Sequence, residues 1–380
     1  MFEARRWTVP VDDAAVDDLL ARLRHTQWPD EINDDSWGWG VAAGYLRELV
    51  NAWIAFDWSG RVRELNNVAH HLADIDGQRI HFIHLPSQGP ARVPLLLLHG
   101  WPGSFVEMLS LAPHLRDAAQ ARGLSFDLVI PSLPGFGFSS RPNRPGTSPE
   151  VAAALFHRLM TGLGYERYGV QGGDIGAGIA VRMALREPDS VLGVHVNYAS
   201  FGVATSWPEP DDGPGPAFDR RREQWAKEEG AYAHVHATRP QTLGYALSDS
   251  PVGLAAWIAE KFFAWTDRRA SGDVPPVALD ELLTNLSVYW FTGTITSSMR
   301  IYKESAADPL VLSEHRRIQV PTGVAAFPYE LPIQPRERIE RVANLVRWTD
   351  MPRGGHFAAL EAPDLLGADV AAFFAELRPA

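Results

Sequence analysis

Cysteine is absent from the 380 residues of the chain, which excludes disulfides, thiolate catalysis and cysteine-ligated metal sites. Positive charge is also scarce, because 35 lysines and arginines stand against 46 aspartates and glutamates, for a formal net charge of −11. This balance argues against nucleic acid or an anionic membrane surface as a partner. The sequence has no apolar run of about 18 residues, the length that a membrane-spanning helix needs. Its first residues lack the apolar core of a signal peptide, and we therefore expect a soluble, cytoplasmic protein.

The composition is that of an ordinary globular protein, with 46% apolar and 21% charged residues. A chain of 380 residues forms either one large domain or a domain with a substantial insertion. Its 13 tryptophans are many for this length and indicate a large aromatic-lined interior or cavity.

A glycine-rich motif, GGDIG at residues 172–176, connects an apolar run to a helix-like segment. Small residues around one reactive side chain at a strand-to-helix turn are typical of the nucleophile elbow of α/β-hydrolases, because any Cβ on the neighbours would collide with the adjacent strand and helix. The apex is Asp174 where serine is expected. A carboxylate can displace a leaving group at a saturated carbon and form an alkyl–enzyme ester, which favours epoxide opening or carbon–halogen cleavage. The same residues also fit a turn in which Asp174 only caps the helix.

The sequence pattern predicts that the chain has four parts. Residues 1–70 are expected to form helices and loops, an N-terminal helical meander without a catalytic constellation. Residues 71–199 alternate strands and helices, as a mostly parallel sheet requires. Helix-like runs over residues 200–305, after a Pro/Gly/Asp-rich linker, predict a helical lid, and the alternation resumes over residues 306–380. The predicted fold class is therefore α/β: an α/β-hydrolase fold with a mostly parallel, doubly wound sheet, a lid insertion and the N-terminal meander.

An aspartate nucleophile needs a base, and an acid that orients this base. His356 lies on a glycine-rich loop before the closing helix and is the expected base, although a histidine there also fits a helix cap. Glu330 follows the strand that begins near residue 320 and gives the order nucleophile, acid, base of α/β-hydrolases. Asp350, on the strand directly before His356, is the competing acid.

The oxyanion donors are expected in the motif HGWPG at residues 99–103, which follows a buried strand. We expect the backbone N–H groups of Trp101 and Ile175 to stabilise the oxyanion formed when water attacks the ester. Trp101, Pro102 and Ile175 are also the expected substrate-binding residues, whereas a structural role is expected for His99.

Epoxide opening also needs a proton donor for the departing oxygen. Tyrosine, with an ordinary pKa near 10, donates a hydrogen bond at neutral pH. The lid region offers four tyrosines, and spacing alone does not choose among them: Tyr232, Tyr245, Tyr289 and Tyr302.

Taken together, these motifs resemble those of the microsomal-type epoxide hydrolases, including their soluble bacterial members, over nearly the whole chain. The motifs WPD at residues 28–30 and WGWG at residues 37–40 resemble the family's N-terminal domain. The resemblance also chooses the tyrosines, because EGAY ending at Tyr232 and MRIYKE around Tyr302 match the family's two lid tyrosines. The family usually has tryptophan after the nucleophile, so Ile175 is expected to change the pocket wall and the preferred substrate shape. The anchor of the membrane-bound relatives is absent, which favours a soluble enzyme.

The resemblance implies an epoxide hydrolase that produces a vicinal diol. Asp174 would attack an epoxide carbon while Tyr232 and Tyr302 hydrogen-bond the oxygen, and His356, held by Glu330, would activate the water that cleaves the ester. The expected partner is a small-molecule epoxide, bulky and apolar or aromatic, met in detoxification or in natural-product biosynthesis. A homodimer is compatible with the sequence.

No cofactor or metal is implied. His234 and His236 would share a face if their segment were a strand, but two histidines without a third ligand make a poor metal site.

Two other functions share parts of this pattern. A haloalkane dehalogenase uses the same aspartate nucleophile but commonly binds the halide with an indole N–H next to it, where this chain has Ile175. A non-catalytic receptor of α/β-hydrolase fold tends to lose a member of the triad, and all three members are available here. Serine esterases and lipases are excluded because the elbow has no serine.

Overall fold

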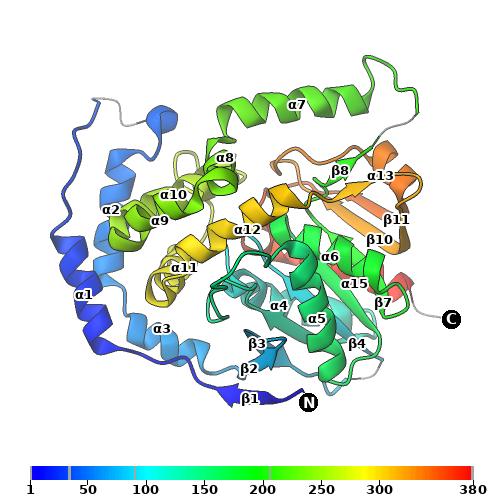
Figure 1. Ribbon diagram of the computed structural model, residues 1–380, viewed down its shortest axis with the longest axis horizontal. Helices are drawn as coiled ribbons and strands as arrows, with labels where there is room; N and C mark the ends of the chain where they lie inside the picture. Colours follow the sequence, from blue (N-terminus) through cyan, green and yellow to red (C-terminus); the bar gives the residue numbers. More distant parts are fainter. Residues whose placement is uncertain (1, 33–35, 90, 205–206, 378–380) are drawn as a thin grey trace.

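The structure, a computed structural model, describes residues 2–32, 36–89, 91–204 and 207–377. Within these residues the chain forms a nine-stranded sheet with helices on both faces and a second group of helices beside it (Figure 1). In spatial order the strands of the sheet are β1 (Ala4–Trp7), β2 (His70–Ile75), β3 (Gln78–Leu85), β5 (Ser125–Pro131), β4 (Arg92–Leu98), β6 (Tyr168–Gly172), β7 (Val191–Val196), β10 (Ile318–Ala326) and β11 (Ala343–Asp350).

The sheet changes direction of pairing along its width. The pairs β1–β2, β2–β3 and β3–β5 are antiparallel. The remaining pairs, β5–β4, β4–β6, β6–β7, β7–β10 and β10–β11, are parallel. β4 lies between β5 and β6, so the chain after β4 first adds a strand on one side of it and then continues on the other side. A sheet with this order has its binding crevice beyond the carboxyl ends of the central strands.

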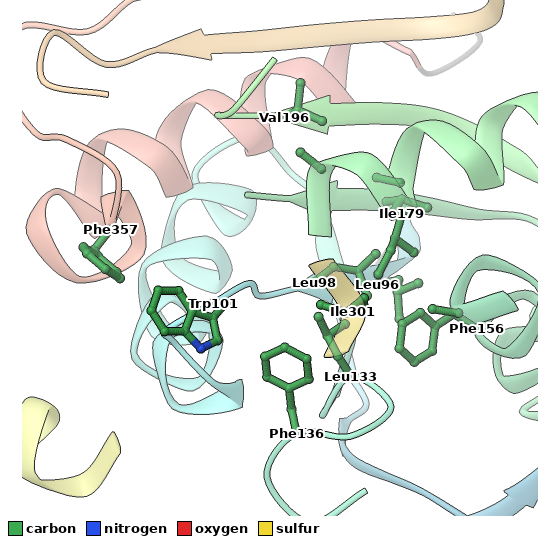
Figure 2. Packing of buried hydrophobic residues seen from close by; sticks show 14 of the residues in the cluster. Leu96, Leu98, Trp101, Leu133, Phe136, Phe156, Ile179, Val196, Ile301 and Phe357 are labelled. Atoms are coloured by element: carbon green, nitrogen blue, oxygen red, sulfur yellow. The ribbon is translucent and has the colours of Figure 1, made fainter. Parts of the chain in front are cut away.

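Helices cover both faces of the parallel part, which explains why its strands are continuous apolar runs. Leu95 and Leu97 of β4 pack on one face and Leu96 and Leu98 on the other, and all four are fully buried. Figure 2 shows the second face, where Leu96 and Leu98 lie beside Ile179. The helices of the first face are α4 (Phe105–Gln120) and α15 (Pro363–Glu376), those of the second are α5 (Pro149–Gly162) and α6 (Asp174–Arg186), and the second half of the chain adds α13 (Arg336–Val342) and α14 (Ala358–Glu361).

The second group of helices lies between β7 and β10 in the sequence and is called the lid here. A short parallel pair, β8 (Gly202–Val203) and β9 (Val311–Leu312), flanks it in the sequence. Its helices are α7 (Pro214–Glu228), α8 (Ala231–Thr238), α9 (Pro240–Asp249), α10 (Pro251–Ala264), α11 (Leu279–Thr292) and α12 (Ile295–Ala307).

The N-terminal segment runs along the outside of the lid (Figure 1). Its elements are α1 (Asp13–Arg24), a 3-10 turn (Trp37–Trp39), α2 (Ala43–Ala55) and α3 (Trp58–Leu65). The indole of Trp53 donates a buried hydrogen bond of 2.9 Å to Ser287 of α11, and Arg61 donates to Thr284 on the same helix. The segment therefore holds lid helices in place against the rest of the molecule.

One element differs from the sequence expectation for this segment, which was helices and loops. Residues 4–7 form β1, which pairs with β2 and extends the sheet. Four residues at a sheet edge show too little alternation to be read from sequence, because their pairing comes from a strand more than sixty residues away. Among the described residues, none of the helices has both the length and the apolar character required to cross a bilayer.

Candidate active site

The motif at residues 172–176 forms a sharp strand-to-helix turn. β6 ends at Gly172, α6 begins at Asp174, and the backbone φ of Asp174 is +47°, a conformation that non-glycine residues adopt rarely and at a cost in energy. A Cβ on Gly172 would overlap the backbone of Gly176, and a Cβ on Gly176 would overlap the carbonyl of Leu98. The glycines are therefore needed for the turn that presents the Asp174 carboxylate at the carboxyl end of the sheet.

One oxygen of this carboxylate accepts a hydrogen bond from the oxyanion loop. The N–H of Trp101 donates to Asp174 Oδ1 at 2.8 Å. Gly100 has no room for a Cβ, which would overlap the Asp174 side chain. Ile175 follows in the first turn of α6, where backbone N–H groups have no partner within the helix and favour a negative charge. Trp101 N therefore contacts Asp174 directly, while the role of the Ile175 N–H stays a prediction.

A histidine lies beside the other oxygen, and a second carboxylate binds the far nitrogen of this histidine. His356 Nε2 is 3.4 Å from Asp174 Oδ2, and His356 Nδ1 is 2.5 Å from Glu330 Oε1. The two loops are joined by a bridge between Tyr329 and Gly355. The competing acid, Asp350, is exposed at the end of β11 and accepts a hydrogen bond from Trp348. The expected base and acid are therefore assembled with the nucleophile.

The buried pair of His356 and Glu330 is strongly coupled. Burial by itself would lower the pKa of His356, but the Glu330 and Asp174 carboxylates raise it well above its usual value. Burial raises the pKa of Glu330, and the imidazole opposes this rise. The imidazole lies between two carboxylates, which favour its protonated form.

Two of the four lid tyrosines face the nucleophile. Tyr232 of α8 and Tyr302 of α12 line one cavity together with Asp174, and their rings are 5.8 Å apart. Tyr289 is buried but donates its hydroxyl to the carbonyl of Gly103, and Tyr245 is 71% exposed. The packing therefore distinguishes Tyr232 and Tyr302 from the other two tyrosines, which the sequence spacing could not do.

Both tyrosine hydroxyls are neutral donors in this setting. Burial, and next the Asp174 charge, raises the pKa of Tyr232 well above 10. Burial also raises the pKa of Tyr302. The Tyr302 hydroxyl is buried and interacts with the neighbouring Tyr232 hydroxyl, without a short hydrogen bond to any other described residue. The two hydroxyls therefore lie together in the cavity that Asp174 lines.

The cavity has a volume of about 360 Å³ and a mixed aromatic and aliphatic wall that includes Ile175, Phe201 and Trp225. Of the three expected substrate contacts, Ile175 lines it. Trp101 instead lies behind Tyr232, with the two rings stacked at 5.2 Å. Pro102 is buried in the loop, where its carbonyl accepts a hydrogen bond from Asn285. Substrate contact of Trp101, Pro102 and Ile175 stays a prediction, and of these three residues only Ile175 lines this cavity.

Sequence reasoning missed Tyr198, which lies just past the end of β7, lines the same cavity and packs edge-on against His356 with ring centroids 5.3 Å apart. The available signal was its position after a strand adjacent to the elbow strand, at the edge where functional groups gather. His99 has the structural role expected for it, because Leu133 N donates to its Nε2 and its Nδ1 lies 3.1 Å from the Gly100 carbonyl.

His234 and His236 lie on a helix, α8, so the alternative of a shared strand face is wrong. His234 is exposed, whereas His236 is buried and accepts a hydrogen bond from Trp257. Burial, with Lys261 contributing, lowers the pKa of His236 to about 3. No group of three or more potential metal ligands occurs in the described residues.

The fold and the arrangement of Asp174, His356 and Glu330 define a hydrolase of α/β-hydrolase fold with an aspartate at its elbow. Sequence models of two families match the chain: the one described as "Epoxide hydrolase N terminus" at residues 4–108 and the one described as "alpha/beta hydrolase fold" at residues 93–235.

Known proteins resemble the chain over nearly its full length. Epoxide hydrolase 1 of Oryctolagus cuniculus is 37% identical, with 97% of this chain and 88% of that protein covered. The crystal structure of juvenile hormone epoxide hydrolase from Bombyx mori matches with a TM-score of 0.89 at 32% identity, covering 100% of this chain and 95% of that one. The structure of Aspergillus niger epoxide hydrolase matches with a TM-score of 0.87 at 32% identity, covering 99% and 97%. The chain belongs to the epoxide hydrolase family and is an enzyme that hydrolyses small-molecule epoxides.

Proposed function

We propose that the enzyme acts in two steps through a covalent ester on Asp174. In the first step Asp174 Oδ2 attacks an epoxide carbon, the carbon–oxygen bond of the ring breaks, and its electron pair moves to the epoxide oxygen. Tyr232 and Tyr302 donate hydrogen bonds to this oxygen and supply its proton. Their raised pKa values support this assignment, since both remain protonated donors at neutral pH.

In the second step water attacks the ester carbonyl carbon and His356 takes its proton. The developing charge falls on Oδ1, the oxygen that accepts from Trp101 N and faces the first turn of α6 at Ile175. Glu330 holds the imidazole by Nδ1 and stabilises its positive form. The diol leaves when the bond between the ester carbonyl carbon and the diol oxygen breaks, and this oxygen takes the proton that His356 removed from the water. The second water proton, left on the Asp174 carboxyl, replaces the proton that the tyrosines supplied in the first step.

Ester formation itself prepares the base for the second step. The negative charge of Asp174 is one of the two charges that raise the pKa of His356. An ester carries no charge, so alkylation of Asp174 removes this contribution and lowers the pKa of the imidazole. His356 then gives up its proton more readily and can accept one from water, which orders the two steps.

We further propose a bulky epoxide with an apolar or aromatic substituent as the substrate. The cavity of about 360 Å³ is within the range of pockets that enclose whole small molecules. Its aromatic wall is contributed mainly by residues 200–305, which we propose to act as the lid over the core formed by residues 71–199 and 306–380. Residues 1–70 would support this lid from outside. The epoxide hydrolase of Bombyx mori, whose fold this chain shares, is named for juvenile hormone.

The observation that carries the mechanism is that the two oxygens of Asp174 have different partners, Trp101 N on Oδ1 and His356 on Oδ2. A single turnover in ¹⁸O-labelled water, with enzyme in excess over an aryl epoxide, tests it. The label is expected in the Asp174 carboxylate and not in the diol, because the diol takes its new oxygen from Asp174. Label in the diol, with none in Asp174, would contradict the covalent mechanism and indicate direct attack by water.

A further inference from the structure

A second, much smaller cavity lies behind Asp174. Its volume is about 20 Å³, which is enough for one water molecule. Polar groups line it from the oxyanion loop, from the elbow and from the base, among them Gly100, Asp174, Asn197 and His356. The lining of the larger cavity includes both tyrosines but not His356. The two cavities therefore approach the same carboxylate with different sets of residues.

Glu107, on the first turn of α4, supplies a further carboxyl group to the small cavity. Its residue is only 8% exposed. Gly103 makes this position available, because a Cβ on Gly103 would overlap the Glu107 carboxyl oxygen Oε1. The two glycines of the oxyanion loop thus have separate purposes: Gly100 leaves space for Asp174, and Gly103 leaves space for Glu107.

His99 also lines the small cavity but is already committed elsewhere. Its Nε2 accepts from Leu133 N and its Nδ1 lies beside the Gly100 carbonyl. Burial lowers the pKa of His99 to about 4, so it is neutral and both of its nitrogens are used. The side chains left to bind a water beside Asp174 are therefore His356, Glu107 and the amide N–H₂ of Asn197, whose Oδ1 already accepts from Gln171. The Glu107 carboxyl also accepts a hydrogen bond from the Ser104 backbone, which leaves part of its hydrogen-bonding capacity for the water.

We propose that the small cavity is the binding site of the hydrolytic water and that Glu107 holds this water in line with the Asp174 ester carbonyl. The inference rests on the proposed two-step mechanism. The water oxygen forms a bond to the carbonyl carbon while one of its protons moves to His356 Nε2, and its other proton is hydrogen-bonded to Glu107. The carbonyl electron pair moves to Oδ1 and returns as the bond to the diol oxygen breaks, and that oxygen takes the proton from His356.

The charge state of Glu107 agrees with this assignment. Burial raises the pKa of Glu107 to about 8, with His356 opposing the rise and Asp174 adding to it. The carboxyl is therefore mostly protonated at neutral pH and adds no negative charge beside the nucleophile. A neutral carboxyl has both a hydroxyl donor and a carbonyl acceptor, so it can accept the water's hydrogen bond and still donate one.

The test compares variants of this contact in both steps, with styrene oxide and stilbene oxide as probes. Glu107→Met keeps an unbranched side chain of similar length without the carboxyl. Glu107→Gln keeps a neutral acceptor, and Gly103→Ala displaces the carboxyl from the loop side. Leu111→Met is the matched control, because Leu111 is fully buried one turn further along α4 and outside the cavity. Rapid quenching followed by intact-protein mass measurement gives the rates of ester formation and ester loss separately.

Glu107→Met is expected to slow ester loss about 10- to 100-fold, the effect of one lost hydrogen bond to the reacting water, with ester formation within about threefold. Gly103→Ala should have the same effect on ester loss. It therefore still tests the inference if the Glu107→Met variant does not fold. Glu107→Gln should stay within about tenfold of wild type in ester loss, and Leu111→Met should change the two steps alike.

Ester loss at the wild-type rate in Glu107→Met would overturn the inference. An equal decrease of both steps in both Glu107 variants would assign Glu107 a structural role and would overturn it as well. Failure of the mechanism itself gives a different result, since no ester would then form in the wild-type enzyme or in any variant.

Discussion

The chemical groups on the two sides of Asp174 differ. On the lid side, α8 and α12 contribute two neutral hydroxyls, from Tyr232 and Tyr302, to a cavity of about 360 Å³. On the core side, the loops after β10 and β11 contribute a buried ion pair of Glu330 and His356 beside a cavity of about 20 Å³. One side has room for a substrate and places two neutral hydroxyls on it, with Arg182 the other charged residue of its lining. The other side has room for one water and a strongly coupled pair of charges.

This difference shows how one carboxylate can serve two successive reactions. Ring opening places negative charge on the substrate oxygen, and neutral donors with high pKa values can stabilise it without competing with Asp174 for a proton. Ester hydrolysis requires a proton acceptor whose affinity for protons changes when Asp174 is alkylated, and only a charged pair in contact with Asp174 responds in this way. Substitutions on one side should therefore affect one step and spare the other.

The largest separation is expected on the lid side. A Tyr232→Phe and Tyr302→Phe double variant keeps both rings, including the stacking on Trp101, and removes both hydroxyls. Ester formation should fall about 10³- to 10⁴-fold, because the leaving oxygen then has no donor, while loss of a preformed ester stays within about threefold. Single-turnover rapid quenching measures both rates.

Tyr245→Phe is the matched control for this double variant, because Tyr245 is an exposed tyrosine of the same lid. It should leave both steps unchanged. A double variant that forms ester at the wild-type rate but accumulates it would reverse the assignment of the two sides.

A smaller but more specific effect is expected on the core side from Glu330→Gln. Hydrolysis of the ester should fall about 10²- to 10⁴-fold, the range for removing the acid that orients a catalytic histidine. The pH at which the rate of ester hydrolysis rises should also shift. Hydrolysis rises with pH as His356 loses its proton, and Glu330 is the largest contribution that raises the pKa of His356. Without this charge the pKa is lower, so the rise should occur at lower pH.

Asp350→Asn, which changes the acid that competed with Glu330 in the sequence, is the control and should leave the rate of hydrolysis within about twofold of wild type. The pH profile of ester loss, measured for both variants, distinguishes them. The assignment of Glu330 as the orienting acid would be contradicted if the pH profile of Glu330→Gln did not shift. It would also be contradicted if Asp350→Asn slowed ester hydrolysis as much as Glu330→Gln.

The core side was more predictable from sequence than the lid side. Glycines around Asp174 and Trp101 are a local signature, because a strained turn and a close backbone approach leave no space for a Cβ. Chain order then favoured His356 and Glu330, and the structure assembles both with Asp174. These predictions needed only neighbours in sequence and the rule that functional groups follow the strand ends.

The lid tyrosines depended on the resemblance to a family, because their spacing of about seventy residues has no local signal. What distinguishes them from Tyr289 is packing: the hydroxyl of Tyr289 is already bound to the Gly103 carbonyl. Glu107 was missed for a similar reason. A glutamate on an amphipathic helix usually faces solvent, and only the space left by Gly103 and the packing of α4 against the elbow show that this one is buried.

The most direct test of the central claim is the intact mass of a His356→Gln variant after exposure to a panel of aryl and alkyl epoxides and haloalkanes. Removing the base should leave ester formation intact and stop hydrolysis, so the protein should gain the mass of one whole epoxide, mapped by peptide analysis to Asp174. A gain of an alkyl group with release of halide would instead favour a dehalogenase. Binding of the epoxides without any covalent adduct would contradict the covalent mechanism.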